Sequence, residues 1–319
     1  MHEFELINKY LKNLTAKNSS SLQLNDDVFF DKKNKLVISV DTYNEGCHFI
    51  NLKKPDLVIK KIIRSSISDL ICKGVYPKYY FISVSGSKRN LNNFNLKKLI
   101  KSLKEEQKKY KIFLGGGDTV FSNKLSFTIV SVGFSKNIVF RNKAKINDDI
   151  YVTGNLGDSY TGLLILKKKI KLNSNLNNYF IKKYFLPDIK FLLIKNIKKI
   201  SNTSIDISDG LLSDLEKLIN KQNLSYKILL EKVPISYNLS KTLKNKKLLK
   251  KNFISKGDDY EILFTASKSK RILIKKIAKI TKNKITRIGY IKKNTIKSSV
   301  VNSLNAKISL KNKGYLHSF

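Results

Sequence analysis

Acidic residues are scarce in this chain of 319 residues, which has 24 Asp and Glu against 63 Lys and Arg. The formal net charge of +39 would ordinarily indicate a protein that binds nucleic acid or an anionic membrane surface. Arginine is also rare, and it occurs only at Arg64, Arg89, Arg141, Arg271 and Arg287. Because dedicated nucleic-acid-binding proteins rely on the planar guanidinium group, we interpret the charge as a solvated lysine coat that reflects A/T-rich coding drift. We therefore expect no specific nucleic-acid partner.

Cysteine is limited to Cys47 and Cys72, which form no CxxC pattern, so the sequence implies neither a disulfide framework nor a zinc site. The sequence also lacks a His/Cys metal set and a Ser/His/Asp catalytic order. No apolar run approaches the roughly 20 residues that a membrane-spanning helix requires. The first residues include acids and have no apolar signal core. We expect a soluble cytoplasmic protein with no membrane partner.

Strand-like and helical patterns alternate along both halves of the sequence. Helical spacing predicts helices over residues 3–14, 55–73, 94–110, from about 160, 177–200 with an interruption at Pro187, 211–221 and 268–282. Apolar runs predict strands at residues 36–40, 81–85, 112–114, 125–134, 150–153, 204–206, 226–230, 260–265 and 285–291. This interleaving indicates an α+β (mixed α/β) protein. Polar residues crowd over 136–149, and we place a boundary there between two domains, residues 1–140 and 141–319.

The few acids recur beside Gly, Ser and Thr, which is unusual for a solvated surface. They lie in the segments 26–27, 41–42, 68–69, 116–119, 157–159, 206–210 and 257–260. If the fold brings these carboxylates together, their repulsion requires bound cations or a retained proton. Short carboxylate side chains suit Mg²⁺, which in turn suits polyphosphate chemistry. The pattern predicts an enzyme that uses ATP.

Two motifs have both a functional and a structural interpretation. Residues 114–119 follow a predicted strand, and their glycines would let backbone N–H groups approach a phosphate while Asp118 held a metal. A plain glycine turn explains this run equally well. In the second motif, Asp206 and Asp209 bracket Ser208 at the start of a predicted helix, where the helix dipole favours an anion. Helix capping by Ser208 or Asp209 explains one of these residues but not all three, so we favour a functional role.

Isolated polar residues are harder to interpret. Asp41 ends a predicted strand and offers a metal-binding carboxylate, and His48 downstream offers an imidazole for a substrate. A single His is equally consistent with a structural role. Asp26-Asp27 is likewise consistent with a turn, and Asp69 with an exposed acid on a helix.

Taken together and in this order, the motifs resemble those of the thiamine-monophosphate kinase family, in the aminoimidazole-ribonucleotide synthetase-like superfamily. The resemblance covers nearly the whole chain, through residues 25–27, 39–42, 45–49, 66–69, 116–119, 152–159, 205–211, 257–265 and 313–319. It implies a two-domain fold of this superfamily. An N-terminal sheet domain would bind ATP and Mg²⁺ and form a homodimer, and a C-terminal α/β domain would complete the active site.

The resemblance also implies ATP-dependent phosphorylation of thiamine phosphate to thiamine diphosphate by direct in-line transfer, with several Mg²⁺ ions. The implied metal ligands are Asp27, Ser39, Val40, Asp41, Asp69, Asp118, Asp206 and Asp209. The implied ATP contacts are Gly117, Asp118, Arg141 and Ser208. The implied contacts to thiamine phosphate are His48, Asp258 and Asn312. No general base is assigned, because a phosphate monoester is already partly ionised at neutral pH.

Several positions depart from the family pattern, and three of them are implied contacts to metal or substrate. Val40 replaces a Thr and could bind a metal only through its carbonyl, Asp258 is one methylene shorter than the usual Glu, and Asn312 replaces an aromatic residue. Three alternatives therefore stay open. The chain could be another ATP-using enzyme of the superfamily, a basic nucleic-acid-binding protein, or an inactive relative.

The metal assignment leads to a first prediction. Asp41→Asn and Asp206→Asn should each abolish turnover and leave the fold intact, because each removes a carboxylate that would hold Mg²⁺. The measurements are product formation at saturating Mg²⁺ and circular dichroism of each variant. Near-normal turnover in both variants would contradict the assignment.

Overall fold

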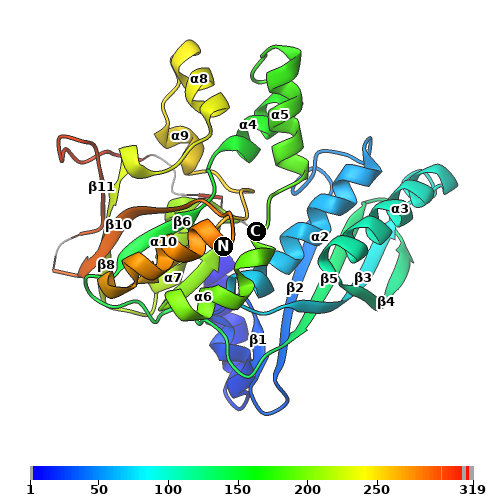
Figure 1. The fold of residues 1–319 in the computed structure, drawn as a ribbon. Coiled ribbons are helices and arrows are strands. Elements are labelled where there is room, and N and C mark those ends of the chain that lie inside the picture. The colour runs from blue at the N-terminus through cyan, green and yellow to red at the C-terminus, as the bar shows by residue number, and fades with distance from the viewer. Residues whose placement is uncertain (1–2, 296, 311–313, 316–319) are drawn as a thin grey trace.

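The structure is a computed structural model that describes residues 3–295, 297–310 and 314–315. It contains two β-sheets, one from each half of the chain, with helices between and around them (Figure 1). The prediction of a mixed α/β protein is confirmed. The domain limits 1–140 and 141–319 stay a prediction.

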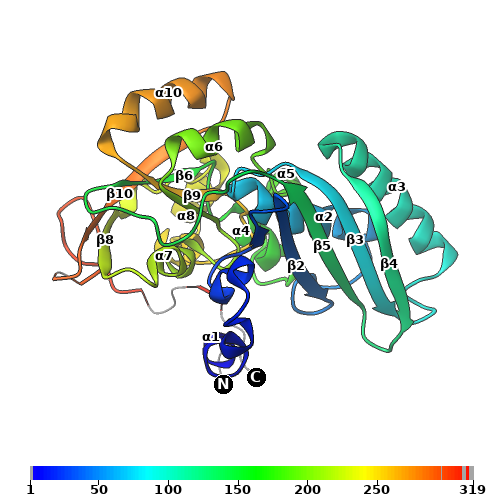
Figure 2. The same cartoon turned by 90° about the horizontal axis from the view of Figure 1, so that it is seen from below.

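The N-terminal half forms a five-stranded sheet in the order β1-β2-β5-β3-β4. Its strands are β1 (Phe29–Asp31), β2 (Leu36–Asn44), β3 (Pro77–Gly86), β4 (Phe113–Phe121) and β5 (Ser126–Phe134). β3 and β4 pair in parallel, and the other pairs of this sheet are antiparallel. Helices α2 (Pro55–Cys72) and α3 (Asn93–Tyr110) lie on one side of the sheet (Figure 2). Before them come α1 (Glu3–Leu6), the π-helix η1 (Ile7–Leu11) and the 3-10 helices η2 (Lys12–Thr15) and η3 (Ser19–Leu24).

The C-terminal half forms a six-stranded sheet in the order β11-β8-β10-β6-β9-β7. Its strands are β6 (Asp149–Thr153), β7 (Thr203–Asp206), β8 (Leu224–Leu229), β9 (Ile262–Ala266), β10 (Ile285–Lys293) and β11 (Ser299–Val301). Its helices are α4 (Asp158–Leu166), α5 (Ser174–Phe185), α6 (Ile194–Ile200), α7 (Leu211–Ile219), α8 (Tyr237–Asn245), α9 (Lys251–Ile254) and α10 (Arg271–Ile280). Three short 3-10 helices complete this half, namely η4 (Phe191–Leu193), η5 (Leu230–Lys232) and η6 (Lys268–Lys270).

Both faces of the second sheet are covered, which explains why β6 is buried along its whole length. Ile150 and Val152 belong to the apolar cluster that contains α7, whereas Tyr151 between them joins the cluster of α6 and α10. This is the alternation expected of a strand whose successive side chains point to opposite faces.

Helix α2 lies between the two halves and is buried along most of its length. Pro55 suits its first turn, where no backbone N–H is needed. Because the helix contacts both the first sheet and β7, even charged residues on it are enclosed. Arg64, for example, forms two hydrogen bonds of 2.8 Å with Glu106 of α3, as a buried ion pair requires.

The opposite face of the first sheet carries exposed apolar side chains. By strand alternation and register, this outer face includes Val40 of β2, Tyr79 and Phe81 of β3, Phe113 and Val120 of β4, and Phe134 of β5. An apolar patch of this kind usually marks an interaction surface. Among the described residues, no helix combines the length and apolarity needed to cross a membrane.

Several local predictions need correction. The segment 3–14 is α-helical only over Glu3–Leu6 and continues as the π-helix η1 and the 3-10 helix η2. The predicted interruption of the helical segment 177–200 at Pro187 is confirmed, because α5 ends at Phe185 and α6 begins at Ile194. The glycine run is not a loop after a strand, because it lies inside β4. There a side chain on Gly117 would come within 1.8 Å of the Ile82 carbonyl oxygen, so close strand approach explains that glycine. The sequence patterns missed β1, β11, α8 and α9.

Candidate active site

A cavity of about 510 Å³ lies where β2, α2, β7 and the loop before β9 meet. It collects predicted site residues that are far apart in the sequence, namely Asp27, Val40, Asp41, His48, Asp69, Asp206, Ser208, Asp209 and Asp258. The predicted convergence is therefore present for five of the seven acidic segments, because Asp118 and Asp158 do not line this cavity.

Three carboxylates at the centre of this cavity have no built-in positive partner, and we call them the central acids: Asp41, Asp69 and Asp206. Ser39 donates a hydrogen bond of 2.5 Å to Asp69, whereas Asp41 Oδ2 is buried without a hydrogen-bond partner among the described residues. Burial raises the pKa of Asp41 to about 7 and that of Asp206 to about 8, and nearby carboxylates, including Asp27, add to both shifts. Burial and the charge of Asp41 raise the pKa of Asp69. The central acids must hold protons or bind cations.

The acids line the cavity at separate positions. No three acid, His or Cys side chains in the described part of the chain lie close enough together to enclose one metal ion. Mg²⁺ commonly binds one or two carboxylates and completes its octahedral shell with water and substrate phosphate. The donor chemistry of the central acids fits such ions, which would be shared with a polyphosphate ligand.

Asp27 differs from the central acids, because it is paired with cations. Lys73 and Arg141 approach its two carboxylate oxygens at 2.7 and 3.0 Å. Burial by itself would raise the pKa of Asp27, but these two cations outweigh burial and lower the pKa below its ordinary value. Asp27 therefore fits a metal ion less well than the central acids do.

Asp214 organises the loop that carries Ser208 and Asp209. Its carboxylate accepts hydrogen bonds of 3.0 Å from the backbone N–H groups of Asp209 and Gly210, just before α7. Gly210 occupies the N-cap position of α7, so neither Ser208 nor Asp209 caps this helix. The capping alternative is therefore wrong, and both side chains line the cavity. Asp209 also forms an ion pair with Lys217.

The other end of the cavity holds His48 and Asp258. Lys61 of α2 forms an ion pair of 3.0 Å with Asp258, and Tyr260 donates a hydrogen bond of 3.2 Å to the same carboxylate. The Lys61 ammonium also lies 3.6 Å from the centre of the Tyr184 ring. Tyr184 donates a hydrogen bond to the backbone oxygen of His48 at 3.2 Å, so the two predicted substrate contacts are linked. Burial lowers the pKa of Lys61, and Asp258 opposes this shift.

Some predicted site residues do not line the cavity. Ser39 lies behind it on Asp69, and Arg141 is buried behind Asp27, where its Nε also donates to the Asn25 carbonyl at 3.1 Å. Gly117 and Asp118 are exposed on β4. Asn312 lies outside the described residues.

Sequence reasoning missed Lys61, Lys73 and Tyr315. Tyr315 lines the cavity, and its hydroxyl lies 3.3 Å from Cys47 Sγ. The backbone N–H of Tyr315 donates to the backbone oxygen of Asp209 at 3.0 Å, so Tyr315 is held beside a predicted metal ligand. An aromatic residue in a polar C-terminal tail was the available signal.

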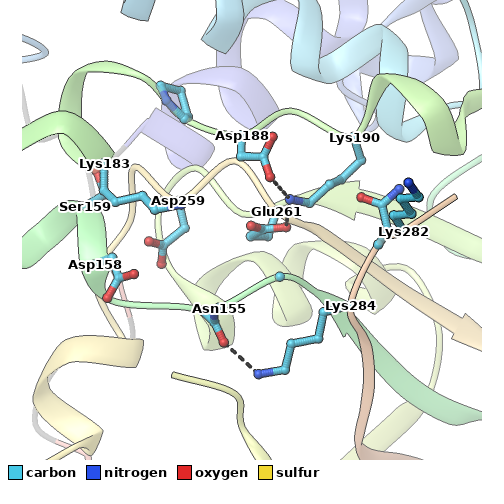
Figure 3. Close-up of a pocket in the computed structure, with 13 residues that line it drawn as sticks. Asn155, Asp158, Ser159, Lys183, Asp188, Lys190, Asp259, Glu261, Lys282 and Lys284 are labelled. Atoms are coloured by element: carbon cyan, nitrogen blue, oxygen red, sulfur yellow. Dashed lines mark hydrogen bonds and ion pairs between the residues drawn. The ribbon is translucent and has the colours of Figure 1, made fainter. Parts of the chain in front are cut away.

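A smaller cavity of about 220 Å³ lies at the start of α4 (Figure 3). One of its lysines is paired with two of its acids. Lys190 forms ion pairs of 3.0 Å with both Asp188 and Glu261, and Lys284 donates to Asn155 at 2.7 Å. None of the predicted site residues lines this cavity, so the larger one is the candidate active site.

Known proteins resemble this chain over most of its length. A family model, AIR synthase related protein, N-terminal domain, matches residues 25–135. The thiamine-monophosphate kinase of Buchnera aphidicola subsp. Acyrthosiphon pisum (strain APS) is 37% identical over 297 residues, which cover 91% of this chain and 90% of that protein. A solved structure described as AaThiL complexed with AMPPCP and TMP is 28% identical with a TM-score of 0.86, covering 99% and 97% of the two chains. A solved structure of thiamine monophosphate kinase from Aquifex aeolicus is 27% identical to this chain with a TM-score of 0.80, and the match covers 97% of this chain and 99% of that one.

The raised pKa values of Asp41 and Asp206 predict how stability depends on pH. An acid whose pKa is higher in the folded state stabilises the fold at low pH, and this contribution is lost as pH rises through the folded value. The melting temperature of the metal-free protein should therefore fall between about pH 5 and about pH 8.5, and Asp206→Asn should reduce the fall. Mg²⁺ should raise the melting temperature at the higher pH. Identical pH profiles for the variant and the unaltered protein would contradict this prediction.

Proposed function

The chain belongs to the thiamine-monophosphate kinase family, and we propose that it transfers a phosphoryl group from ATP to thiamine phosphate, giving thiamine diphosphate. The observation that carries this proposal is a single cavity in which Asp41, Asp69 and Asp206 lack built-in cations. A structural relative that was solved with AMPPCP and TMP supports the choice of substrates.

Both substrates are anionic, so the reaction requires charge neutralisation and alignment. Mg²⁺ held by the central acids would neutralise the charge on the transferring phosphoryl group. Ser208 would contact ATP. At the other end, His48 and Asp258 would orient thiamine phosphate for in-line attack by its terminal oxygen. The fixed separation of the two ends of the cavity would align the reacting atoms.

We also propose that the chain forms a homodimer through the outer face of the first sheet. The exposed side chains of Phe81, Phe113 and Val120 support this, because they leave a wide apolar surface without a covering helix. Asp118 lies on the same face, since it pairs in register with Ser83, two residues after Phe81. A dimer through this face would place the predicted ATP-binding residues Gly117 and Asp118 at the interface with a second copy.

The activity is tested directly with purified protein, ATP, Mg²⁺ and thiamine phosphate. We expect thiamine diphosphate to form only when Mg²⁺ is present, as detected by chromatography of the products. Unphosphorylated thiamine is the matched control, because a thiamine kinase would use it and a thiamine-phosphate kinase would not. A protein that consumes no ATP but binds DNA with steep salt dependence would instead favour the nucleic-acid alternative.

The dimer is tested by placing a charge on the outer face. Phe81→Glu should shift the molar mass in light scattering from twice the chain mass to the chain mass, because a carboxylate would be buried at the interface. Tyr237→Glu is the control, since Tyr237 is 79% exposed on α8, away from this sheet. A dimer that persists in Phe81→Glu, or dissociates equally in the control, would contradict the proposed interface.

A further inference from the structure

Lys73 is a fully buried ammonium next to the candidate active site, and the mechanism above gives it no role. It follows the last residue of α2, where a positive charge is favourable to the helix dipole. Its Nζ lies 2.7 Å from Asp26 Oδ1 and 2.7 Å from Asp27 Oδ2, and it donates to the Ser204 backbone oxygen at 2.8 Å. The ammonium thus lies within 3.0 Å of three oxygen atoms, and it donates a hydrogen bond to the one from Ser204.

Arg141 completes the set of contacts around the two acids. Its backbone N–H donates to Asp26 Oδ2 at 2.9 Å, and its Nη1 donates to Asp27 Oδ1 at 3.0 Å. Asp27 Oδ2 meets Lys73 as an ion pair without hydrogen-bond geometry. Every carboxylate oxygen of Asp26 and Asp27 therefore has a protein nitrogen within 3.0 Å.

These four side chains form a group whose charges cancel, with two cations and two anions. We call this group, Asp26, Asp27, Lys73 and Arg141, the neutral quartet. The central acids show the opposite arrangement, because among the described residues no Lys or Arg forms an ion pair with Asp41, Asp69 or Asp206, and burial dominates the rise of their pKa values. The cavity is thus lined both by Asp27, which is paired with cations of the protein, and by the central acids, which are not.

We propose that Lys73 is a built-in cation that takes the place of a divalent ion at Asp27, so that the chain binds Mg²⁺ through its central acids and not through Asp27. A divalent ion on Asp27 would lie at contact distance from an ammonium and a guanidinium, whose charges repel it. Moving Lys73 away would instead leave a buried ammonium without its partners. Asp27 keeps 15% of its side chain exposed at the cavity wall, where its charge acts at a distance.

This inference rests on the proposed use of Mg²⁺, and it is tested by counting metal ions rather than by turnover. Mn²⁺ bound per chain would be measured by electron paramagnetic resonance in the presence of AMPPCP and without thiamine phosphate. Asp27→Asn should bind as many ions as the unaltered protein, with affinities within about threefold. The matched control, Asp69→Asn, should lose an ion or bind it at least about tenfold more weakly. Loss of an ion in Asp27→Asn would overturn the proposal, and so would a failure of the unaltered protein to bind Mn²⁺.

A second pair of variants tests the role of Lys73 itself. Lys73→Met keeps the length of the side chain but removes its charge, so Asp27 should gain a Mn²⁺ ion or at least about tenfold in affinity. The double variant Lys73→Met with Asp27→Asn should lose this gain, and a gain that persists would overturn the assignment to Asp27. If Lys73→Met does not fold, as judged by circular dichroism, the comparison of Asp27→Asn with Asp69→Asn still decides. A chain with this metal pattern that makes no thiamine diphosphate would refute the proposed function and leave the inference about Lys73 intact.

Discussion

Repulsion between buried carboxylates is the constraint on which the rest of this structure depends. The chain is strongly basic, yet many of its few acids gather at one cavity. A buried anion must be paired, protonated or bound to a cation, and the fold uses different solutions at different positions. Asp27 has Lys73 and Arg141, and Asp209 has Lys217. The central acids have none of these, so an external cation or a retained proton must balance them.

Helix α2 places both a central acid and lysines that pair with other acids beside the cavity, because residues four apart share one face of a helix. Lys61, Ser65, Asp69 and Lys73 follow this spacing. Ser65 and Asp69 line the cavity, whereas Lys61 and Lys73 pair with acids at its two ends. The stripe spans about 18 Å at 1.5 Å per residue, so one rigid element fixes the distance between the end of the cavity that holds Asp258 and the neutral quartet. Burial of α2 between the two sheets is what makes charged residues on it costly to leave unpaired.

The sequence predicted the order of most strands and helices, and also the convergence of Asp41, Asp69, Asp206 and Asp258, because short acidic motifs follow apolar runs with a clear period. It could not single out Lys61 or Lys73, since lysine is so frequent that no one lysine stands out. The role of Asp214 was also not apparent from the sequence, because its carboxylate accepts hydrogen bonds from the backbone N–H groups of Asp209 and Gly210, five and four residues earlier. The glycine run was wrongly interpreted as a loop, because glycine also occurs inside a strand where two strands approach closely.

The position of Asp118 connects the cavity to the outer face. Asp118 lies too far across the sheet to join the central acids within one chain. The cavity nevertheless reaches the outer face of the first sheet, because Val40 and Thr42 line the cavity and both lie on the outer side of β2. The apolar residues of β3 and β4 continue the same surface. A second copy seated there would therefore border the open side of the cavity as well as cover the apolar patch. Assembly and completion of the proposed nucleotide site would then depend on one surface.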